Sequence, residues 1–125
     1  MATTRRSLCP VSCTLDLLGD RWTLLIVRDL VRGKQRYSDF LESPEGIPSN
    51  ILANRLSRLR RKGIVKAKRY LSHPPRFAYH LTPKGEALRP VLHAMADWGV
   101  KHAGARVPPA VSSSDGSTTD RTRRW

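Results

Sequence analysis

This 125-residue chain lacks the features that mark secreted and membrane proteins. It has only two cysteines, Cys9 and Cys13, whose spacing fits neither a disulfide framework nor the usual zinc pairs. No apolar run approaches the roughly 20 residues that a membrane span needs, and the N-terminus has no uninterrupted apolar stretch of the kind found in secretion signals. We therefore expect a single cytoplasmic domain with reduced thiols and no membrane partner.

Patterns that indicate catalysis or metal binding are also missing. The four histidines, His73, His80, His93 and His102, are scattered without the spacing of metal ligands. No serine lies in a Gly-x-Ser-x-Gly context, and no glycine-rich loop is present that would cradle a phosphate. The sequence thus predicts that the protein is not an enzyme and uses no metal and no cofactor.

Positive charge, in contrast, is present in large excess. The chain has 23 Lys and Arg against 10 Asp and Glu, a formal net charge of +13. No acidic residue occurs between Glu45 and Glu86, whereas ten Lys or Arg do. Such an excess favours a polyanionic partner, with nucleic acid ahead of an anionic membrane surface.

Hydrophobic periodicity and capping residues predict a mainly helical α+β fold. The expected helices run from Val11 to about Leu18, from Asp20 as N-cap to Gly33, from Ser38 as N-cap to just before Ser43-Pro44, from Ser49 as N-cap to Lys62, and from Thr82-Pro83 through Trp98. Two alternating segments, 64–71 and 76–82, predict a β-hairpin closed by the turn Ser72-His73-Pro74-Pro75. A short helix, a basic helix and then a hairpin is the order of a winged helix-turn-helix.

The basic helix expected over residues 49–62 has two different faces. At about 100° per residue, Leu52, Leu56 and Leu59 share the face that would pack on the core. The opposite face collects Asn50, Asn54, Ser57 and Arg61, with Ala53 and Arg58 beside them. Asn can pair with adenine and Arg with guanine, and a merely solvated helix would include glutamates, which this one lacks. We therefore interpret the helix as one that reads DNA.

The hairpin extends the same basic surface. Lys66 and Lys68 on its first strand, and His73 and Arg76 at its tip, are candidate contacts to the phosphate backbone or a narrow minor groove. For the two lysines, an equally good interpretation is that they only protect a strand edge from aggregation. Arg76 is the stronger candidate because two prolines before it stiffen the loop, whereas His73 fits a solvated residue better than a sensor.

Several motifs coincide in order and spacing with a known family. The segments CPVSCTLDLLGDRWTLLIVRDL, RYSDFLE, GIPSNILANRLSRLRRKGIV, PPRFAYHLTPKGEALRPVL and ADWG, from about Cys9 to Gly99, together resemble HxlR-type winged helix-turn-helix transcriptional regulators of the MarR-like superfamily. The resemblance implies a homodimer that binds a near-palindromic operator on double-stranded DNA, often as a repressor and sometimes as an activator. The implied DNA contacts are Ser49, Asn50, Asn54, Arg55 and Arg58 in the reading helix and Arg76 in the wing, and Ser38 is a further candidate. Our helical projection puts Arg55 on the flank, which predicts a phosphate contact or a structural role.

The same resemblance implies that the N- and C-terminal helices flanking the winged domain form the dimer. The dimerisation candidates are Val11, Leu15 and Leu18 in the first helix and Leu88, Val91, Leu92, Met95 and Trp98 in the last. A long apolar stripe after the wing has little of its own domain to cover, so it would be exposed and available to a partner.

Cys9 and Cys13 are candidate redox residues. In some members of the family, the cysteine before proline senses oxidants or electrophiles, and a thiol near a helix N-terminus with Arg5 and Arg6 nearby should have a lowered pKa. Cys13, one turn further on, would be a resolving partner or simply a small core residue. A small-molecule effector between the DNA-binding region and the dimer helices is the other signal that the resemblance allows, and the sequence names no ligand.

The expected organisation is a flexible N-terminal arm over residues 1–8, an HxlR-type DNA-binding and dimerisation domain over 9–105, and a disordered basic tail over 106–125, which is rich in Pro, Ser, Thr and Gly. The competing interpretation is a basic winged-helix protein that binds RNA or a protein partner without operator specificity.

Overall fold

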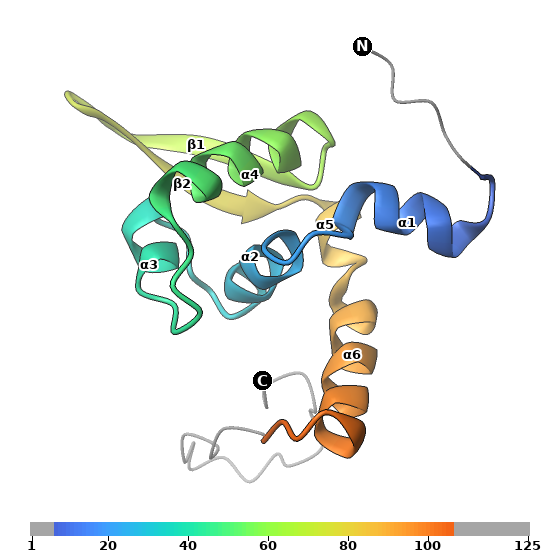
Figure 1. The fold of residues 1–125 in the computed structure, drawn as a ribbon. Helices are drawn as coiled ribbons and strands as arrows, with labels where there is room; N and C mark the ends of the chain where they lie inside the picture. Colours follow the sequence, from blue (N-terminus) through green and yellow to red (C-terminus); the bar gives the residue numbers. More distant parts are fainter. Residues whose placement is uncertain (1–6, 107–125) are drawn as a thin grey trace, which may run out of the picture.

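The computed structural model describes residues 7–106. Its elements are α1 (Pro10–Leu18), α2 (Thr23–Val31), α3 (Tyr37–Leu41), α4 (Ser49–Arg61), β1 (Val65–Ser72), β2 (Pro75–Leu81), α5 (Pro83–Glu86) and α6 (Arg89–His102). Figure 1 shows α2, α3, α4 and the hairpin as the body of the molecule, from which α1 extends to one side and α6 extends downward. The predicted winged helix-turn-helix with flanking terminal helices is confirmed.

The core forms where α2, α3 and α4 meet. Its most buried large side chains are Ile26, Val27, Phe40, Leu52, Leu56 and Leu59. The three leucines come from one face of α4, as the three- and four-residue spacing predicts, and Ile51 is half-buried beside them. Burial of this stripe fixes the rotation of α4 and therefore determines which of its residues face solvent.

The hairpin and α5 pack against the end of α4. The two strands are antiparallel, with Val65 opposite Leu81 and Lys68 opposite Ala78. Gly85 of α5 lies against the backbone of Ile64. A Cβ atom at Gly85 would be 2.3 Å from the Ile64 carbonyl oxygen, so only glycine fits without a shift of the backbone. This close approach holds α5 against Ile64, the residue between α4 and β1, and so fixes the base of the hairpin next to the C-terminal end of α4.

Three predicted helix starts need correction or refinement. Ser38 lies inside α3, whose N-cap is Arg36, and the Asp39 carboxylate accepts the hydrogen bond from the Arg36 N–H instead. Ser49 is the first residue of α4, and Pro48 is the N-cap because its extended backbone directs the chain into the helix. Asp20 accepts hydrogen bonds at the start of α2, as predicted, although the helix itself begins at Thr23.

The single C-terminal helix that we predicted is two helices. Thr82 does cap the first of them by accepting the Gly85 N–H, but α5 ends at Glu86. Pro90, in the first turn of α6, has no N–H to donate to the carbonyl of Glu86. A single helix running from Pro83 to His102 would therefore lack one backbone hydrogen bond at this point.

The predicted ends of the chain fall largely beyond the described part. The arm over residues 1–8 and the tail over 106–125 lie outside the described residues except for 7, 8 and 106.

The hairpin turn predicted over residues 72–75 is tighter than expected, because Ser72 and Pro75 still pair across the hairpin. In residues 7–106, no helix is long and apolar enough to cross a membrane.

Candidate nucleic-acid interface

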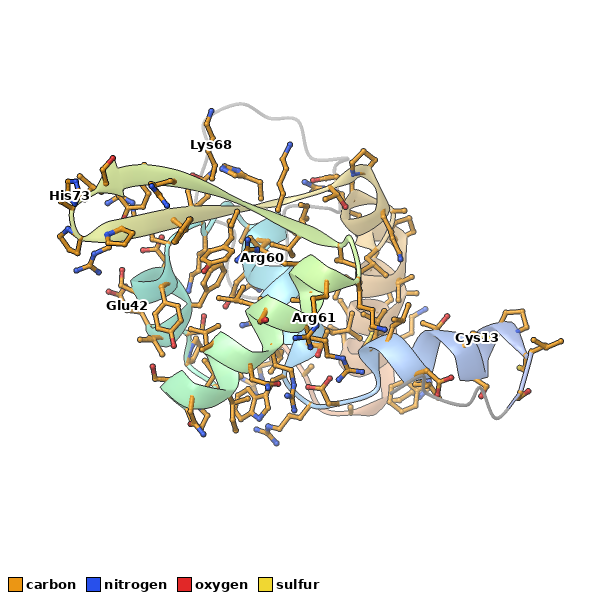
Figure 2. The ribbon with its side chains drawn as sticks, turned by 90° about the horizontal axis from the view of Figure 1, so that it is seen from above. Cys13, Glu42, Arg60, Arg61, Lys68 and His73 are labelled. Carbon is orange, nitrogen blue, oxygen red and sulfur yellow. The ribbon has the colours of Figure 1, made fainter. Side chains whose placement is uncertain are left out.

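The outward face of α4 is polar and open to solvent. Its exposed members are Ser49, Asn50, Ala53, Asn54, Ser57 and Arg61. Figure 2 looks onto the side of the molecule where α4 and the hairpin lie next to each other, with Arg61 on the helix and Arg60 on its hairpin side. Because the leucine stripe holds the opposite face on the core, these polar groups are held in a fixed orientation toward solvent.

Two arginines of α4 are tied to the α1–α2 corner. Nε of Arg55 donates to Oδ2 of Asp20 at 2.8 Å, and its Nη1 donates to Oδ1 of Asn54 at 2.6 Å. This pairing favours the structural role for Arg55 over a phosphate contact. Nη2 of Arg58 donates to the Asp16 carbonyl at 2.8 Å, at the C-terminal turn of α1. The guanidinium thus satisfies a free helix carbonyl at the negative end of the helix dipole, so the prediction that Arg58 simply faces outward is corrected.

Asp20 remains ionised well below neutral pH. Burial would raise the pKa of its carboxyl, but hydrogen bonds from the Thr23 hydroxyl and from Arg55 outweigh burial and lower the pKa to about 2. Asp20 therefore carries its negative charge throughout the neutral range and holds Arg55 in place.

The hairpin carries its basic residues on open surface. Lys66, Lys68, His73 and Arg76 are all exposed. Figure 2 shows His73 at the far tip and Lys68 extending from β1 on the side away from α4. The wing therefore widens the basic surface beyond the helix, while Lys68 lies at its outer margin.

The middle of the hairpin is held against the segment before α3. The Tyr79 N–H donates to the Gln35 carbonyl at 2.7 Å, and an isolated bridge pairs Arg36 with Ala78. The Arg36 guanidinium also lies 4.7 Å from the centre of the Tyr70 ring, a cation–π contact. These contacts, which sequence reasoning missed, fix the direction of the hairpin relative to α3.

The first turn of α4 is attached to α3 through Tyr37. The Tyr37 hydroxyl lies 2.8 Å from Oγ of Ser49 and donates to the Ser49 carbonyl. Ser49, predicted as a DNA contact, is thus exposed but already engaged, whereas Ser38 is exposed on α3. Tyr37 was not predicted, and its only sequence signal is its place at the start of a short helix.

A buried polar network supports the loop that leads into α4. Both terminal nitrogens of Arg28 donate to Glu45, each at 2.7 Å, and Nη2 also donates to Asp29 at 2.9 Å. The Ser43 hydroxyl donates to Asp29 and accepts from Nζ of Lys34 at 2.9 Å. Sequence reasoning missed this network, although two adjacent charged residues inside the apolar α2 segment were a usable signal.

The two cysteines lie at the start of α1. Cys9 is exposed, and backbone N–H groups of Ser12 and Val11 at the helix start lower the pKa of its thiol. Cys13 is half-buried, and its Sγ lies 3.5 Å from the Ser7 carbonyl oxygen. Among residues 7–106, no group of three or more His, Cys, Asp or Glu side chains is arranged to hold a metal ion.

The terminal helices expose apolar side chains. Val11, Leu15, Met95 and Trp98 are 67%, 59%, 51% and 62% exposed, and Val91 is 37% exposed. Leu18 and Leu92, in contrast, are buried, and the half-buried Leu88 packs against the same core. Leu18 and Leu92 thus lie in the core of this chain and offer little surface to a partner, whereas Leu88 keeps part of its side chain exposed.

Comparison with known proteins assigns the family. The HxlR-like helix-turn-helix family matches residues 17–106. The uncharacterised HTH-type transcriptional regulator YdeP of Bacillus subtilis (strain 168) is 36% identical over 94 residues, which cover 75% of this chain and 73% of YdeP.

Solved structures agree with this assignment. PA1607 superposes with a TM-score of 0.74 at 35% identity, over 90% of this chain and 82% of PA1607. The redox regulator HypR in its reduced form superposes with a TM-score of 0.69 at 32% identity, over 75% of this chain and 93% of HypR. The chain therefore belongs to the HxlR-like helix-turn-helix family of transcriptional regulators.

Proposed function

We propose that this protein is a homodimeric repressor that binds a near-palindromic DNA operator sequence-specifically. The observation that carries the proposal is the exposed face of α4, where Asn50, Asn54 and Arg61 lie together in a region free of acidic residues from 46 to 85. Asparagine and arginine are the side chains that pair with adenine and guanine in the major groove. Lysines alone would give affinity without sequence preference.

The wing would supply contacts that orient the protein on the duplex. Lys66, Lys68 and Arg76 are exposed on the hairpin and bear charges that complement phosphates. Because phosphate contacts release counterions, affinity should fall steeply as salt rises.

The exposed apolar residues of α1 and α6 support a dimer. Val11 and Leu15 on one helix and Val91, Met95 and Trp98 on the other would be covered by the same residues of a second copy. A two-fold dimer places two copies of α4 on one side of the duplex. Half-sites would then lie about one or two helical turns apart, roughly 34 Å or a multiple of it.

The first test is footprinting at physiological salt on the DNA upstream of the protein's own gene. We expect protection of two half-sites, and Asn50→Ala should weaken binding to them by about 1–3 kcal/mol while leaving binding to random duplex unchanged. Gln35→Ala is the matched control, since it also removes an exposed amide side chain without a change in charge, outside α4. Equal affinity for random duplex, or preference for RNA, would overturn the operator proposal in favour of a nonspecific or RNA-binding winged helix.

The dimer is tested separately by light scattering after gel filtration. Trp98→Glu should give monomers with unchanged helix content, because the side chain is 62% exposed and contributes little to the chain's own core. Operator binding should weaken together with dimerisation. A Trp98→Glu variant that stays dimeric would show that this face is not the interface.

The release signal that we propose is oxidation at Cys9, since its thiol is exposed and its lowered pKa increases the thiolate fraction. The similarity to HypR, a redox regulator, supports this proposal. Diamide would accept two electrons and two protons from two thiols, which then form an S–S bond. We expect a mass shift that matches loss of operator binding, both abolished in Cys9→Ser. Unchanged binding by fully oxidised protein would exclude a redox signal.

A further inference from the structure

Three side chains from two distant segments form a hydrogen-bonded chain that ends on the exposed face of α4. Asp20, in the corner between α1 and α2, accepts from Nε of Arg55 at 2.8 Å, and Nη1 of Arg55 donates to Oδ1 of Asn54 at 2.6 Å. Arg55 and Asp20 are 24% and 23% exposed, whereas Asn54 is open to solvent. These hydrogen bonds thus link a fixed corner of the fold to a candidate base-reading residue.

Asp20 is itself firmly held. Its Oδ2 accepts from the backbone N–H groups of Trp22 and Thr23 at 3.1 and 3.2 Å, and its Oδ1 accepts from the Thr23 hydroxyl. Backbone donors at the start of a helix cannot swing away as side chains do. The carboxylate therefore presents a fixed acceptor to Arg55, and the planar guanidinium takes its orientation from it.

This geometry determines which end of the Asn54 amide faces solvent. Arginine has only donors, so the Asn54 atom directed at Arg55 must be the carbonyl oxygen Oδ1. The amide nitrogen Nδ2, with its two donor hydrogens, is left on the open side. A free asparagine would rotate between the two arrangements, whereas this one presents mainly a donor.

The distinction matters for base reading. Adenine is recognised by an asparagine that donates to N7 and at the same time accepts from the N6 amino group through its oxygen. Guanine offers two acceptors, N7 and O6, on the same edge and needs only donors. An asparagine whose oxygen is held by an arginine matches the guanine edge better than the adenine edge.

We propose that Asp20 and Arg55 are positioning residues that set the base preference of Asn54, favouring guanine over adenine at the base pair it faces. The inference rests on the proposed operator binding. It assigns neither Asp20 nor Arg55 a contact with the base, because both act through the orientation of the Asn54 amide.

The test is binding-site selection from a pool of randomised duplexes, using the full chain. Comparing wild type with Asn54→Ala locates the base pair that Asn54 reads, since only that preference should disappear. Arg55→Lys is the decisive variant, because lysine keeps the positive charge and can still pair with Asp20 but has no second planar nitrogen to hold Asn54. Arg60→Lys is the matched control, since it makes the same change on the same helix six residues after Asn54, which is about 120° around the helix.

In Arg55→Lys we expect the preference for guanine over adenine at that base pair to fall by about tenfold. Affinity for random duplex and its salt dependence should stay unchanged, as should all preferences in Arg60→Lys. A selected motif that is identical in Arg55→Lys and wild type would overturn the positioning role while leaving operator binding intact. If wild type selects no motif, the proposed function fails and the positioning role fails with it.

The variant Asp20→Asn tests the other end of this series of hydrogen bonds, the ion pair between Asp20 and Arg55. It should lower the same guanine preference, and thermal melting measured in parallel separates this effect from loss of the cap on α2. A variant that melts earlier but keeps the wild-type motif would show that Asp20 only supports the fold.

Discussion

Replacing Glu45 by glutamine keeps the shape of the side chain and removes its charge from the loop before α4. In the native protein, Glu45 accepts two hydrogen bonds of 2.7 Å from Arg28, whose side chain is 13% exposed. Arg28 would retain Asp29 as a partner at 2.9 Å, so the variant should fold. The loss should be smaller than the 3–5 kcal/mol typical of leaving a fully buried charge without a partner.

The pKa of Glu45 sets an upper limit on the effect. The hydrogen bonds from Arg28 outweigh burial and lower the pKa from 4.5 to about 2. At about 1.36 kcal/mol per pKa unit, this shift corresponds to at most about 3 kcal/mol of stability at neutral pH. Because 28% of the Glu45 side chain is exposed, solvent screens the pair, and we expect about 1–2 kcal/mol.

The pH dependence gives the prediction its sign. A carboxyl with a lowered pKa stabilises the folded state above its unfolded pKa of 4.5, and this stabilisation is lost as pH falls toward about 2. The stability difference between wild type and Glu45→Gln should therefore be largest near neutral pH and shrink to less than half by about pH 3.

Urea denaturation of both proteins across this pH range measures the difference. Glu42→Gln is the matched control, since Glu42 is an exposed carboxylate on the neighbouring α3 end and should show little difference at any pH. A gap between wild type and Glu45→Gln that stays constant with pH would refute the electrostatic argument. It would mean that shape and not charge stabilises the loop.

Three further changes test other parts of the structure. Gly85→Ala should cost about 1–3 kcal/mol in urea denaturation, because the new Cβ would lie 2.3 Å from the Ile64 carbonyl oxygen and something must shift. Tyr37→Phe should cost about 1 kcal/mol, because it removes the hydroxyl that bonds to Ser49 at the start of α4. Lys68→Ala should weaken DNA binding equally for all sequences and reduce the salt slope by about one, with an unchanged melting temperature. An unchanged slope would place Lys68 outside the interface.

The division of α4 into a buried and an exposed face could be predicted from sequence. Leu52, Leu56 and Leu59 recur at the helical period, so their burial fixes where Asn50 and Asn54 point. The hairpin could also be predicted, because alternation and a proline-bearing turn are local signals. Both features depend on neighbours within a few residues, which is where sequence patterns carry most information.

Contacts between distant segments could not be predicted in this way. Asp20 and Arg55 are 35 residues apart, and Arg28 and Glu45 are 17 apart, so nothing in local spacing connects them. Ser38 and Ser49 were assigned as caps by residue type, but the caps are Arg36 and Pro48, and Ser49 is instead bonded by the Tyr37 hydroxyl from twelve residues away. The misplaced residues are thus those whose positions depend on which segments fold against each other.

The two anchored arginines of α4 differ in how easily DNA could engage them. Arg55 is held by an ion pair to Asp20 and by a bond to Asn54, so releasing it would leave a partly buried carboxylate without its partner. Arg58 makes one bond, to the Asp16 carbonyl, and such a bond contributes only about 0.5–1.5 kcal/mol. A phosphate is a stronger, charged acceptor that Arg58 could take in exchange. Its attachment to α1 therefore leaves Arg58 a candidate DNA contact, and a contact from Arg55 would cost more because the ion pair to Asp20 must break first.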